Sequence, residues 1–578
     1  MTRTLAVAVL LSALLAPGAS LAWPPDPSVT DLSDPSTWPN DPDYDGEWWV
    51  WSFVPASMHE QVRAAEIPMG SGMHADRAWQ ITTGDRRIVI AVLDSGVYWS
   101  EPDYVNQLWL NRGELPEPDP ACRTASYAGD PYDANGDGFF NVQDYTTESG
   151  HQTPKTPCDP RVSDVNSNGM IDVQDLILIF SDGVDDDGNG YVDDISGWDF
   201  KDDDNDPYDD TRFGHGHGEM RLAAAEADNG RGRAGVCPTC MMIMCRTADG
   251  FIADGNRFAE AIIYGVDNGA SVFNVAMGAL NNTPQGLAAI EYAWEEGVAI
   301  SAATGDEDSF HQNLPGANNH TLNVHAVRHD SGSLPQATTF LNFDNCSNYG
   351  AQVLMGVPSD GCASGATAIT AGMTGILYAA ALKADLPRPR SFTTDPNGVR
   401  RLTSGEIRQL YIQTIDDVDV PESRGASPDP TKYQSLPGWD QRFQYGRPNL
   451  RRAVDEVMAG RIPPVVEVTE PLWFQRVDPD QTPTVELRGE VWWRTDRYES
   501  ADLVFEWAAG VEPADAEFKA LDQRTITTPV SGSLNQWNVS GLRIDNPTKY
   551  QSLPGWDQRF QYGRPNLRRA VDEVMAGR

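Results

Sequence analysis

Three short segments of the chain carry side chains that could together hydrolyse an acyl compound. Asp94 ends the run Ile-Ala-Val-Leu-Asp, His215 lies in Gly-His-Gly-His, and Ser364 lies in Cys-Ala-Ser-Gly-Ala. A carboxylate can orient an imidazole, and the imidazole can take the proton of a hydroxyl as its oxygen attacks a carbonyl carbon. The three residues therefore predict a hydrolase that works through an acyl-enzyme on Ser364. Each segment alone is also typical of an ordinary turn or loop, so the prediction depends on all three together.

The apolar runs between these segments predict the scaffold that positions them. Residues 87–93 form a continuous β-branched run, typical of a buried parallel strand. Further runs at 241–244, 271–275 and 298–303 alternate with helical stretches at 218–228, 257–268 and 285–296. Alternation of this kind predicts an α/β fold with a doubly wound parallel sheet, which places functional groups at the carboxyl ends of strands. Asp94 ends its strand in this way, and His215 and Ser364 are each expected to begin a helix.

The other segments differ from this α/β part in composition. Residues 1–22 have a positive start, an apolar centre and a small-x-small end, which predicts a signal peptide and secretion. Residues 23–72 are rich in Pro, Asp and Trp and predict an extended N-terminal arm. The α/β domain is expected over 73–461, with its last helices at 407–414 and 449–458. Residues 462–545 alternate Val, Thr and Trp with turn residues and predict an all-β accessory domain.

One segment near the end is an exact copy of an earlier one. Residues 430–461 recur, letter for letter, as 547–578. Natural repeats diverge and recur at a fixed short period. Either a recent duplication or an error in sequence assembly explains the copy.

The charge of the chain excludes one class of partner and favours another. The formal net charge is −41, which argues against nucleic acid because phosphate binding requires clustered Lys and Arg. Much of the acid excess lies between residues 130 and 210 and indicates cation binding. Residues 366–382 are apolar but short for a membrane span and rich in Ala, Thr and Gly, so we expect a buried core helix there.

The seven cysteines predict disulfides, because secreted proteins usually oxidise them. Cys122 with Cys158, and Cys346 with Cys362, each enclose a compact loop and are the preferred pairs. The remaining cysteines allow a third pair and one free thiol, or, less favourably, part of a zinc site; they are Cys237, Cys240 and Cys245.

With these motifs in their order, residues 73–458 resemble the subtilisin-like serine proteases, or subtilases. The segment 91–97 around Asp94 and the Gly-His-Gly around His215 match that family, and Gly-Val-Cys-Pro at 235–238 resembles its Gly-Val-Ala-Pro. The order Asp, His, Ser is the one found on the subtilisin-type fold. The resemblance implies a secreted serine endopeptidase that cleaves proteins or peptides.

The resemblance also implies a set of substrate-binding residues. Residues 276–278 resemble the edge strand that pairs with the substrate backbone, and 302–305 resemble the wall of the main specificity pocket. The residues concerned are Ala276, Met277, Gly278, Ala302, Ala303, Thr304 and Gly305. Other readings remain: a subtilase-like binding protein with an impaired site, or a non-peptidase hydrolase that uses the same triad.

Several positions depart from the family pattern close to the expected site. Asp306 replaces the Asn that stabilises the oxyanion, so an ionised Asp306 would repel the developing charge and a protonated one could donate a hydrogen bond. Activity should then fall as rising pH removes that proton. His217 replaces a Thr, Cys362-Ala363 replaces Gly-Thr, and Ala368 replaces a Pro.

Two tandem loops within residues 120–194 follow the twelve-residue calcium-loop pattern, with oxygen ligands at fixed positions and Gly at the sixth. The expected ligands of the first are Asp133, Asn135, Asp137, Phe139 through its carbonyl, Asn141 and Asp144. Those of the second are Asp164, Asn166, Asn168, Met170 through its carbonyl, Asp172 and Asp175. Both loops are similar to dockerin repeats, which implies a cohesin-like partner as an alternative to structural calcium.

A third acidic stretch begins in the same way but ends differently. It contains Asp185, Asp187, Asn189, Asp193 and Asp194, while its twelfth position is a Ser. The stretch resembles the calcium-rich insert of bacterial subtilases. We therefore expect Ca²⁺ as the cofactor, stabilising the fold.

Overall fold

The structure is a computed structural model that describes residues 22–542. Short segments within that range are not described, at 125–128, 280, 310–312, 331–337, 344–345, 351, 396–397, 421–434, 472–476, 496 and 510–514. The predicted signal peptide, apart from its last residue, and the second copy of the repeat lie outside the described residues. The first residues of the first copy, up to 434, do so as well.

A parallel sheet forms the centre of the fold, with strand order β10-β8-β7-β5-β1-β3-β2 and β9 added antiparallel to β8. The strands are β1 (Val89–Asp94), β2 (Trp198–Asp199), β3 (Met241–Arg246), β5 (Val272–Val275), β7 (Ala299–Ala303), β8 (Leu322–Asp330), β9 (Thr339–Phe343) and β10 (Met355–Pro358). Because β1, β5 and β7 are neighbours and parallel, their carboxyl ends meet at one edge. The prediction of an α/β parallel sheet is confirmed.

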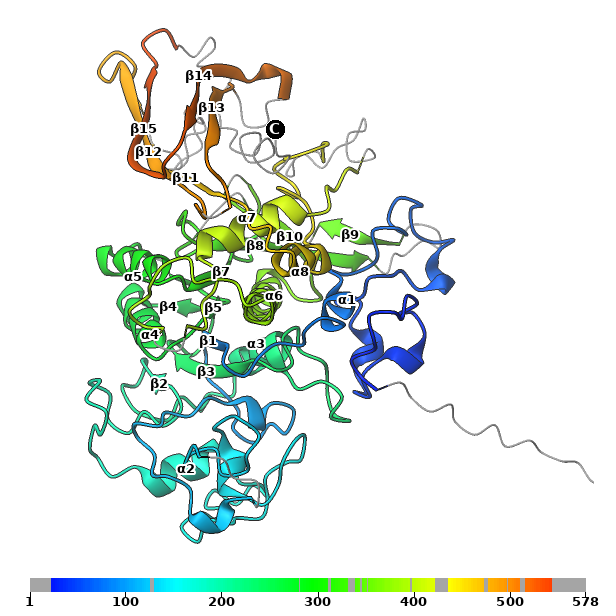
Figure 1. Ribbon diagram of the computed structural model, residues 1–578, viewed down its shortest axis with the longest axis vertical. Coiled ribbons are helices and arrows are strands. Elements are labelled where there is room, and N and C mark those ends of the chain that lie inside the picture. The colour runs from blue at the N-terminus through cyan, green and yellow to red at the C-terminus, as the bar shows by residue number, and fades with distance from the viewer. Residues whose placement is uncertain are drawn as a thin grey trace, which may run out of the picture.

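Helices cover both faces of this sheet (Figure 1). Ile90 and Val92 of β1 belong to one apolar core, and Ala91 and Leu93 belong to the other, as the alternation of side chains along a strand requires. The first core includes α1 (Ala75–Trp79), α3 (His215–Ala224), α6 (Ala363–Lys383), α7 (Ser404–Thr414) and α8 (Leu450–Met458). The second includes α4 (Gly255–Asp267) and α5 (Pro284–Glu295).

Helices α3 and α6 approach each other closely because small residues line their contact. Ala223 of α3 is fully buried. A Cβ added to Gly372 of α6 would lie 2.7 Å from the carbonyl oxygen of Ala223. Helix α3 begins at His215, as the His motif indicated, and ends at Ala224, so the stretch predicted at 218–228 ran four residues too far. Ala225 is extended, and Glu226 N–H donates to the carbonyl of Asp103, which draws the chain away from the helix axis.

Helix α6 runs through the middle of the molecule, as Figure 1 shows end-on. Among the described residues, it is the one helix long and apolar enough to cross a membrane, and 94% of its most apolar window is buried inside the protein. A core helix of a globular domain meets the same criteria. The burial agrees with the core helix expected at 366–382.

The N-terminal arm lies against the α/β domain. It contains η1 (Pro35–Thr37), η2 (Tyr44–Gly46) and η3 (Ala56–Met58). Trp48, Trp49 and Trp51 are buried in the larger apolar core. The indole N–H of Trp48 donates to Asp360 Oδ1 at 2.6 Å, which links the arm to the loop before α6.

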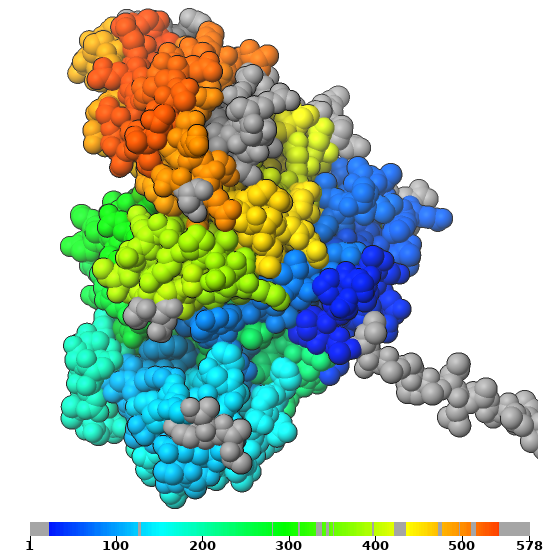
Figure 2. Space-filling model, in the orientation of Figure 1, coloured from blue at the N-terminus to red at the C-terminus, as the bar shows by residue number. Residues whose placement is uncertain are grey.

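The acidic insert and the C-terminal strands lie at opposite ends of the molecule (Figure 2). The segments before and within the insert hold η4 (Val105–Gln107), η5 (Pro120–Cys122), η6 (Val142–Tyr145) and α2 (Val173–Phe180). The C-terminal part holds β11 (Val465–Glu470), β12 (Thr484–Trp492), β13 (Ala501–Trp507), β14 (Lys519–Ile526), β15 (Val530–Asn538) and η8 (Asp515–Glu517). The buried ion pair of Arg494 with Glu406 at 2.6 Å joins this part to α7.

Three disulfides link Cys122 to Cys158, Cys237 to Cys240, and Cys346 to Cys362. Cys245 is free and buried. The two preferred pairs and the third pair are therefore confirmed. With Cys237 and Cys240 joined in a disulfide, a zinc site there has lost two of its ligands.

Candidate active site and calcium loops

Asp94 and His215 form a hydrogen-bonded pair at the carboxyl edge of the sheet. Nδ1 of His215 lies 2.8 Å from Oδ1 and 2.9 Å from Oδ2 of Asp94. Because a carboxylate can only accept a hydrogen bond, Nδ1 carries a proton. Nε2, the other ring nitrogen, is the atom that can exchange a proton with another group. The side chain of Asp94 is fully buried, while that of His215 is 16% exposed.

A glycine at position 216 allows this close approach. A Cβ there would lie 2.6 Å from the carbonyl oxygen of Gly96 and 3.0 Å from Cβ of Asp94. Asp209 fixes the preceding loop, since its buried carboxylate accepts from the N–H groups of Phe213 and Gly214. The first residue of α3 is thereby held over the end of β1.

The environment of His215 favours its protonated form. Burial alone would lower the pKa of the imidazole, but the charge and hydrogen bond of Asp94 outweigh burial. Glu219 and Asp306 add to this effect and the pKa of His215 rises to about 9. Asp94 therefore makes the imidazole of His215 a stronger base than a free imidazole and keeps it protonated to higher pH.

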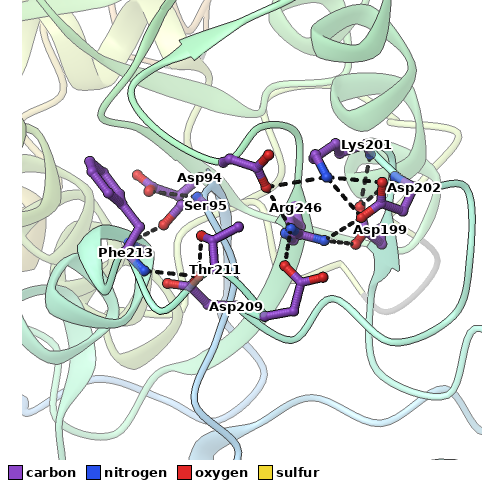
Figure 3. A network of polar contacts seen from close by, with 12 residues as sticks. Asp94, Ser95, Asp199, Lys201, Asp202, Asp209, Thr211, Phe213 and Arg246 are labelled. Atoms are coloured by element: carbon purple, nitrogen blue, oxygen red, sulfur yellow. Dashed lines mark hydrogen bonds and ion pairs between the residues drawn. The ribbon is translucent and has the colours of Figure 1, made fainter.

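The cation beside Asp94 in the sheet is neutralised by other acids (Figure 3). Arg246 of β3 is in register with Asp94, yet its buried guanidinium donates to four other carboxylates. These belong to Asp199, Asp202 at 2.9 Å, Asp210 at 2.6 Å and Asp249 at 2.7 Å. The charge of Arg246 is thus compensated locally, and His215 is the cationic partner of Asp94.

Ser364 lies in the first turn of α6, where backbone N–H groups and the helix dipole favour negative charge. Its hydroxyl donates to the carbonyl of Ala276, just after β5, at 3.2 Å. Among the described residues, no hydrogen bond joins Ser364 to His215. The N-terminus of α6 therefore meets the same sheet edge as the Asp94–His215 pair, with the hydroxyl oriented toward Ala276.

Asp306 follows β7 and reaches the same helix terminus. Its Oδ1 accepts the backbone N–H of Ala363 at 2.9 Å. Cys362 comes immediately before Ala363 and is anchored by its disulfide to Cys346. His217 points elsewhere, since its Nδ1 lies 2.9 Å from the hydroxyl of Tyr104.

The segments expected to bind substrate lie at this edge, but one is already paired. Strand β6 (Gly278–Ala279) is parallel to β4 (Ile252–Ala253), and the N–H of Gly278 donates to the carbonyl of Phe251 at 2.9 Å. Met277 is buried and its sulfur accepts from Thr247. A substrate backbone that pairs with Gly278 must therefore displace Phe251. Ala302 and Ala303 end β7, and Thr304 and Gly305 follow it.

Sequence reasoning missed three side chains around His215. Phe251 and Phe213 are 53% and 44% exposed, and the ring of Phe251 meets the imidazole edge to face at 5.1 Å. Glu219 is buried one turn along α3 from His215. The spacing of four residues was a signal for Glu219, whereas nothing in the sequence indicated the two rings.

The three acidic loops adopt one recurrent turn. In each, the first carboxylate accepts the N–H of the glycine at position six, and that glycine has a positive φ between 92° and 97°. The pairs are Gly138 with Asp133, Gly169 with Asp164, and Gly190 with Asp185. This is the turn that a twelve-residue calcium loop needs.

The first two loops also share the position of their last carboxylate. Asp144 accepts from the N–H of Asn135, and Asp175 accepts from the N–H of Asn166. Burial raises the pKa of Asp144 to about 7, which marks how unfavourable its charge is without a cation. Oδ1 of Asp133 is buried without a hydrogen-bond partner in the described part of the chain. These carboxylate oxygens are ligands that suit a hard cation such as Ca²⁺.

The third loop differs from its prediction in two ligands. Asp193 turns away, because its carboxylate accepts the N–H groups of Asp182 and Gly183. Glu114, from the segment before the insert, instead joins Asp187 and Asp194, with one oxygen of each within 4.8 Å of the others. Oε2 of Glu114 is buried, and within the described residues it has no hydrogen-bond partner. Three gathered carboxylates with such an oxygen also fit a calcium ion.

The carboxyl edge of the parallel sheet brings together an acid, a base and a helix with a serine in its first turn. This is the arrangement of the subtilisin type. The subtilase family matches residues 85–446, and the chain belongs to that family.

Individual relatives match smaller parts of the chain. A thermophilic serine proteinase from Bacillus sp. (strain AK1) is 30% identical over 270 residues, which cover 45% of this chain and 56% of that protein. Thermitase from Thermoactinomyces vulgaris is 32% identical over 124 residues, which cover 21% of this chain and 43% of thermitase. The chain thus spans about half the length of these curated relatives. Among solved structures, the prenylagaramide maturation protease PagA aligns with 66% of this chain and 98% of its own, at a TM-score of 0.37 and 15% identity.

Proposed function

We propose that the chain is a secreted, calcium-stabilised serine endopeptidase. The observation that carries the proposal is the Asp94–His215 pair, at 2.8 Å, at the same sheet edge as a helix that carries Ser364 in its first turn. Membership of the subtilase family supports the same reaction.

In this reaction, Ser364 Oγ bonds to the carbonyl carbon of the scissile peptide while Nε2 of His215 takes its proton. Asp94 holds Nδ1–H and stabilises the imidazolium that forms. His215 then gives the proton to the leaving amine, and water releases the acyl group by the reverse of these steps. The N–H groups of the first turn of α6 stabilise the oxyanion, with Asp306 beside them.

Peptide binding would use the carboxyl edge of the sheet. We propose that the substrate backbone pairs with residues 276–278 after Phe251 has moved away from Gly278, and that residues 302–305 line the pocket for its main side chain. The exposed rings of Phe213 and Phe251 beside His215 favour apolar side chains next to the scissile bond.

The proposal is tested by casein hydrolysis with purified protein, in calcium and in EDTA, with Ser364→Ala as the matched control. Cleavage that is lost in the variant supports the endopeptidase. A fluorophosphonate probe should label the parent and not the variant. A folded, calcium-loaded parent that neither cleaves casein nor reacts with the probe would contradict the proposal. A probe-reactive parent that cleaves esters but no peptide would identify another hydrolase.

We further propose that Ca²⁺ holds the insert in its folded form. The three matching turns, and the unpartnered oxygens of Asp133 and Glu114, support this. Bound calcium would offset the repulsion among carboxylates at each loop and would take no part in the chemistry at Ser364.

Docking through the insert is a second candidate function. Val165, Leu178, Val184 and Val192 are large apolar side chains of the insert that are at least 40% exposed. A binding protein of this kind would bind its partner equally well after Ser364→Ala, whereas exchange of Leu178 for Asp would weaken it. Equal binding by both variants would argue against this surface.

A further inference from the structure

Glu219 carries a buried carboxyl group near Nε2 of His215. Its side chain is 6% exposed, and its Oε1 lies 4.0 Å from Nε2 of the imidazole. Nδ1 of the same ring binds Asp94, so Nε2 is the atom that must accept the Ser364 proton in the proposed reaction. The reaction as described gives Glu219 no task.

The polar atoms around Glu219 are incompletely paired. The Asn274 side chain on β5 faces Glu219 and favours its charged form, but within the described part of the chain neither Oε2 of Glu219 nor either polar atom of Asn274 has a partner at hydrogen-bond distance. Asn274 is fully buried. Unpaired buried polar groups destabilise a fold, and groups of this kind concentrate at functional sites.

The charged groups that face this pair come from three elements. Asp94 approaches from β1, Asp306 from the loop after β7, and His215 from α3 itself. Burial raises the pKa of Glu219 to about 8, against the opposing charge of His215. The pKa of His215 is raised to about 9, and the charge of Glu219 contributes to that rise.

We propose that Glu219 is a positioning residue that holds a proton against Nε2 of His215 in the free site, so that Ser364 becomes reactive only after this proton leaves. The inference rests on the proposed function. Oε1 of Glu219 lies 4.0 Å from Nε2, which is within ion-pair distance but beyond a hydrogen bond. With the proton on Nε2, the Glu219 carboxylate stabilises the imidazolium. The protonated Nε2 has no lone pair with which to accept the Ser364 proton. Once the proton passes to solvent, neutral His215 takes the Ser364 proton as Oγ bonds to the carbonyl carbon.

The orientation of Ser364 agrees with an occupied Nε2. Its hydroxyl donates to the carbonyl of Ala276. Glu219 and Ser364 thus compete for one nitrogen, and substrate binding near Ala276 would displace the hydroxyl toward His215.

The test is the pH profile of kcat/KM for Glu219→Gln, which keeps the shape of the side chain and removes its exchangeable proton. The acid limb should move to lower pH by about one unit, which raises kcat/KM about tenfold on that limb. Glu219→Met removes both polar atoms and should give the same shift. The matched control is Glu226→Gln, because Glu226 is also buried near the end of α3 but faces His151. It should leave the profile unchanged.

A second measurement does not depend on turnover. In Ser364→Ala protein, the imidazole signals of His215 can be titrated by NMR, with and without Glu219→Gln. The midpoint should fall by about one unit when Glu219 is replaced. An unchanged midpoint would overturn the inference even if the protein cleaves casein. A shifted midpoint in a protein that cleaves nothing would retain the proton-holding pair and reject the proposed function.

Discussion

Ala363 donates its backbone N–H to Oδ1 of Asp306 at 2.9 Å, so a carboxyl group occupies the start of the helix that carries Ser364. At the position where an amide would donate to a developing oxyanion, this chain places a group that accepts. The contact joins the end of β7 to the first turn of α6, and it connects the sheet edge to the chemistry expected at Ser364.

Asp306→Asn should raise activity at high pH. Asn keeps the acceptor for Ala363 and adds N–H donors where an ionised Asp306 would repel negative charge. One oxyanion donor is worth about 10²–10³ in kcat, so a gain of about tenfold or more is expected. The measurement is kcat against pH on a chromogenic peptide. Asp308→Asn removes the same charge two residues further on and serves as control. A profile unchanged by Asp306→Asn would remove Asp306 from the mechanism.

Replacing Gly216 should disturb both stability and catalysis. Ala at this position brings a Cβ within 2.6 Å of the carbonyl oxygen of Gly96 and 3.0 Å of Asp94. Overpacking of this kind costs about 1–3 kcal/mol, and the shift moves His215 away from Asp94. Gly218→Ala is the matched control, because nothing lies within 4 Å of its Cβ, and Ala there should stabilise α3 by roughly 0.5–1 kcal/mol. Urea unfolding and kcat/KM of the two variants test this. Equal effects would contradict it.

His215 should stabilise the fold most at low pH. Its folded pKa of about 9 lies above the ordinary value of 6.5, so the folded state binds its proton more tightly. This stability is fully present below about pH 6.5 and is lost as pH rises through 9, by about 3 kcal/mol in total. The free energy of unfolding of the parent, minus that of His215→Gln, should fall over this range with calcium present. A difference that stays constant with pH would refute the raised pKa.

Removal of calcium should lower the melting temperature. One site saturated at a hundredfold excess over its Kd stabilises the folded state by about 2.7 kcal/mol. Calorimetry in calcium and in EDTA measures the loss. Glu114→Gln should weaken the dependence on calcium, because Glu114 completes the group with Asp187 and Asp194. Glu117→Gln, at an exposed position nearby, should not. Identical melting curves in calcium and EDTA would reject the calcium proposal.

The sequence predicted the sheet because its short, continuous apolar runs alternate with helical stretches, a pattern typical of a parallel sheet covered on both faces. β1 and the helices on either side follow directly from this. The His motif gave the start of α3 at His215, with Gly214 as its N-cap at a φ of 77°. The apolar pattern placed the end of the helix four residues too late, because the contact of Glu226 with Asp103 that ends it has no local signal.

The parts of the site that escaped prediction depend on contacts between distant segments. Glu114 precedes the third loop by about 70 residues and reaches Asp187 only through the packing of the insert on the sheet. Gly278 was expected to be free for a substrate, and only the position of β4 shows that Phe251 already accepts its N–H. Pairwise contacts of this kind have no local sequence signature.

The N-terminal arm has a consequence for the order in which the fold is assembled. Residues made early in synthesis rest on residues made late, since the carbonyl of Met73 accepts the N–H of Leu450 and that of Ser71 accepts from Arg447. Likewise, the hydrogen bond of Trp48 can form only after Asp360 has been synthesised. Contacts between such distant positions form slowly, because a long stretch of chain must close before they are made. A chain still being synthesised therefore lacks the contacts that hold residues 71–73 in place until α8 has been made.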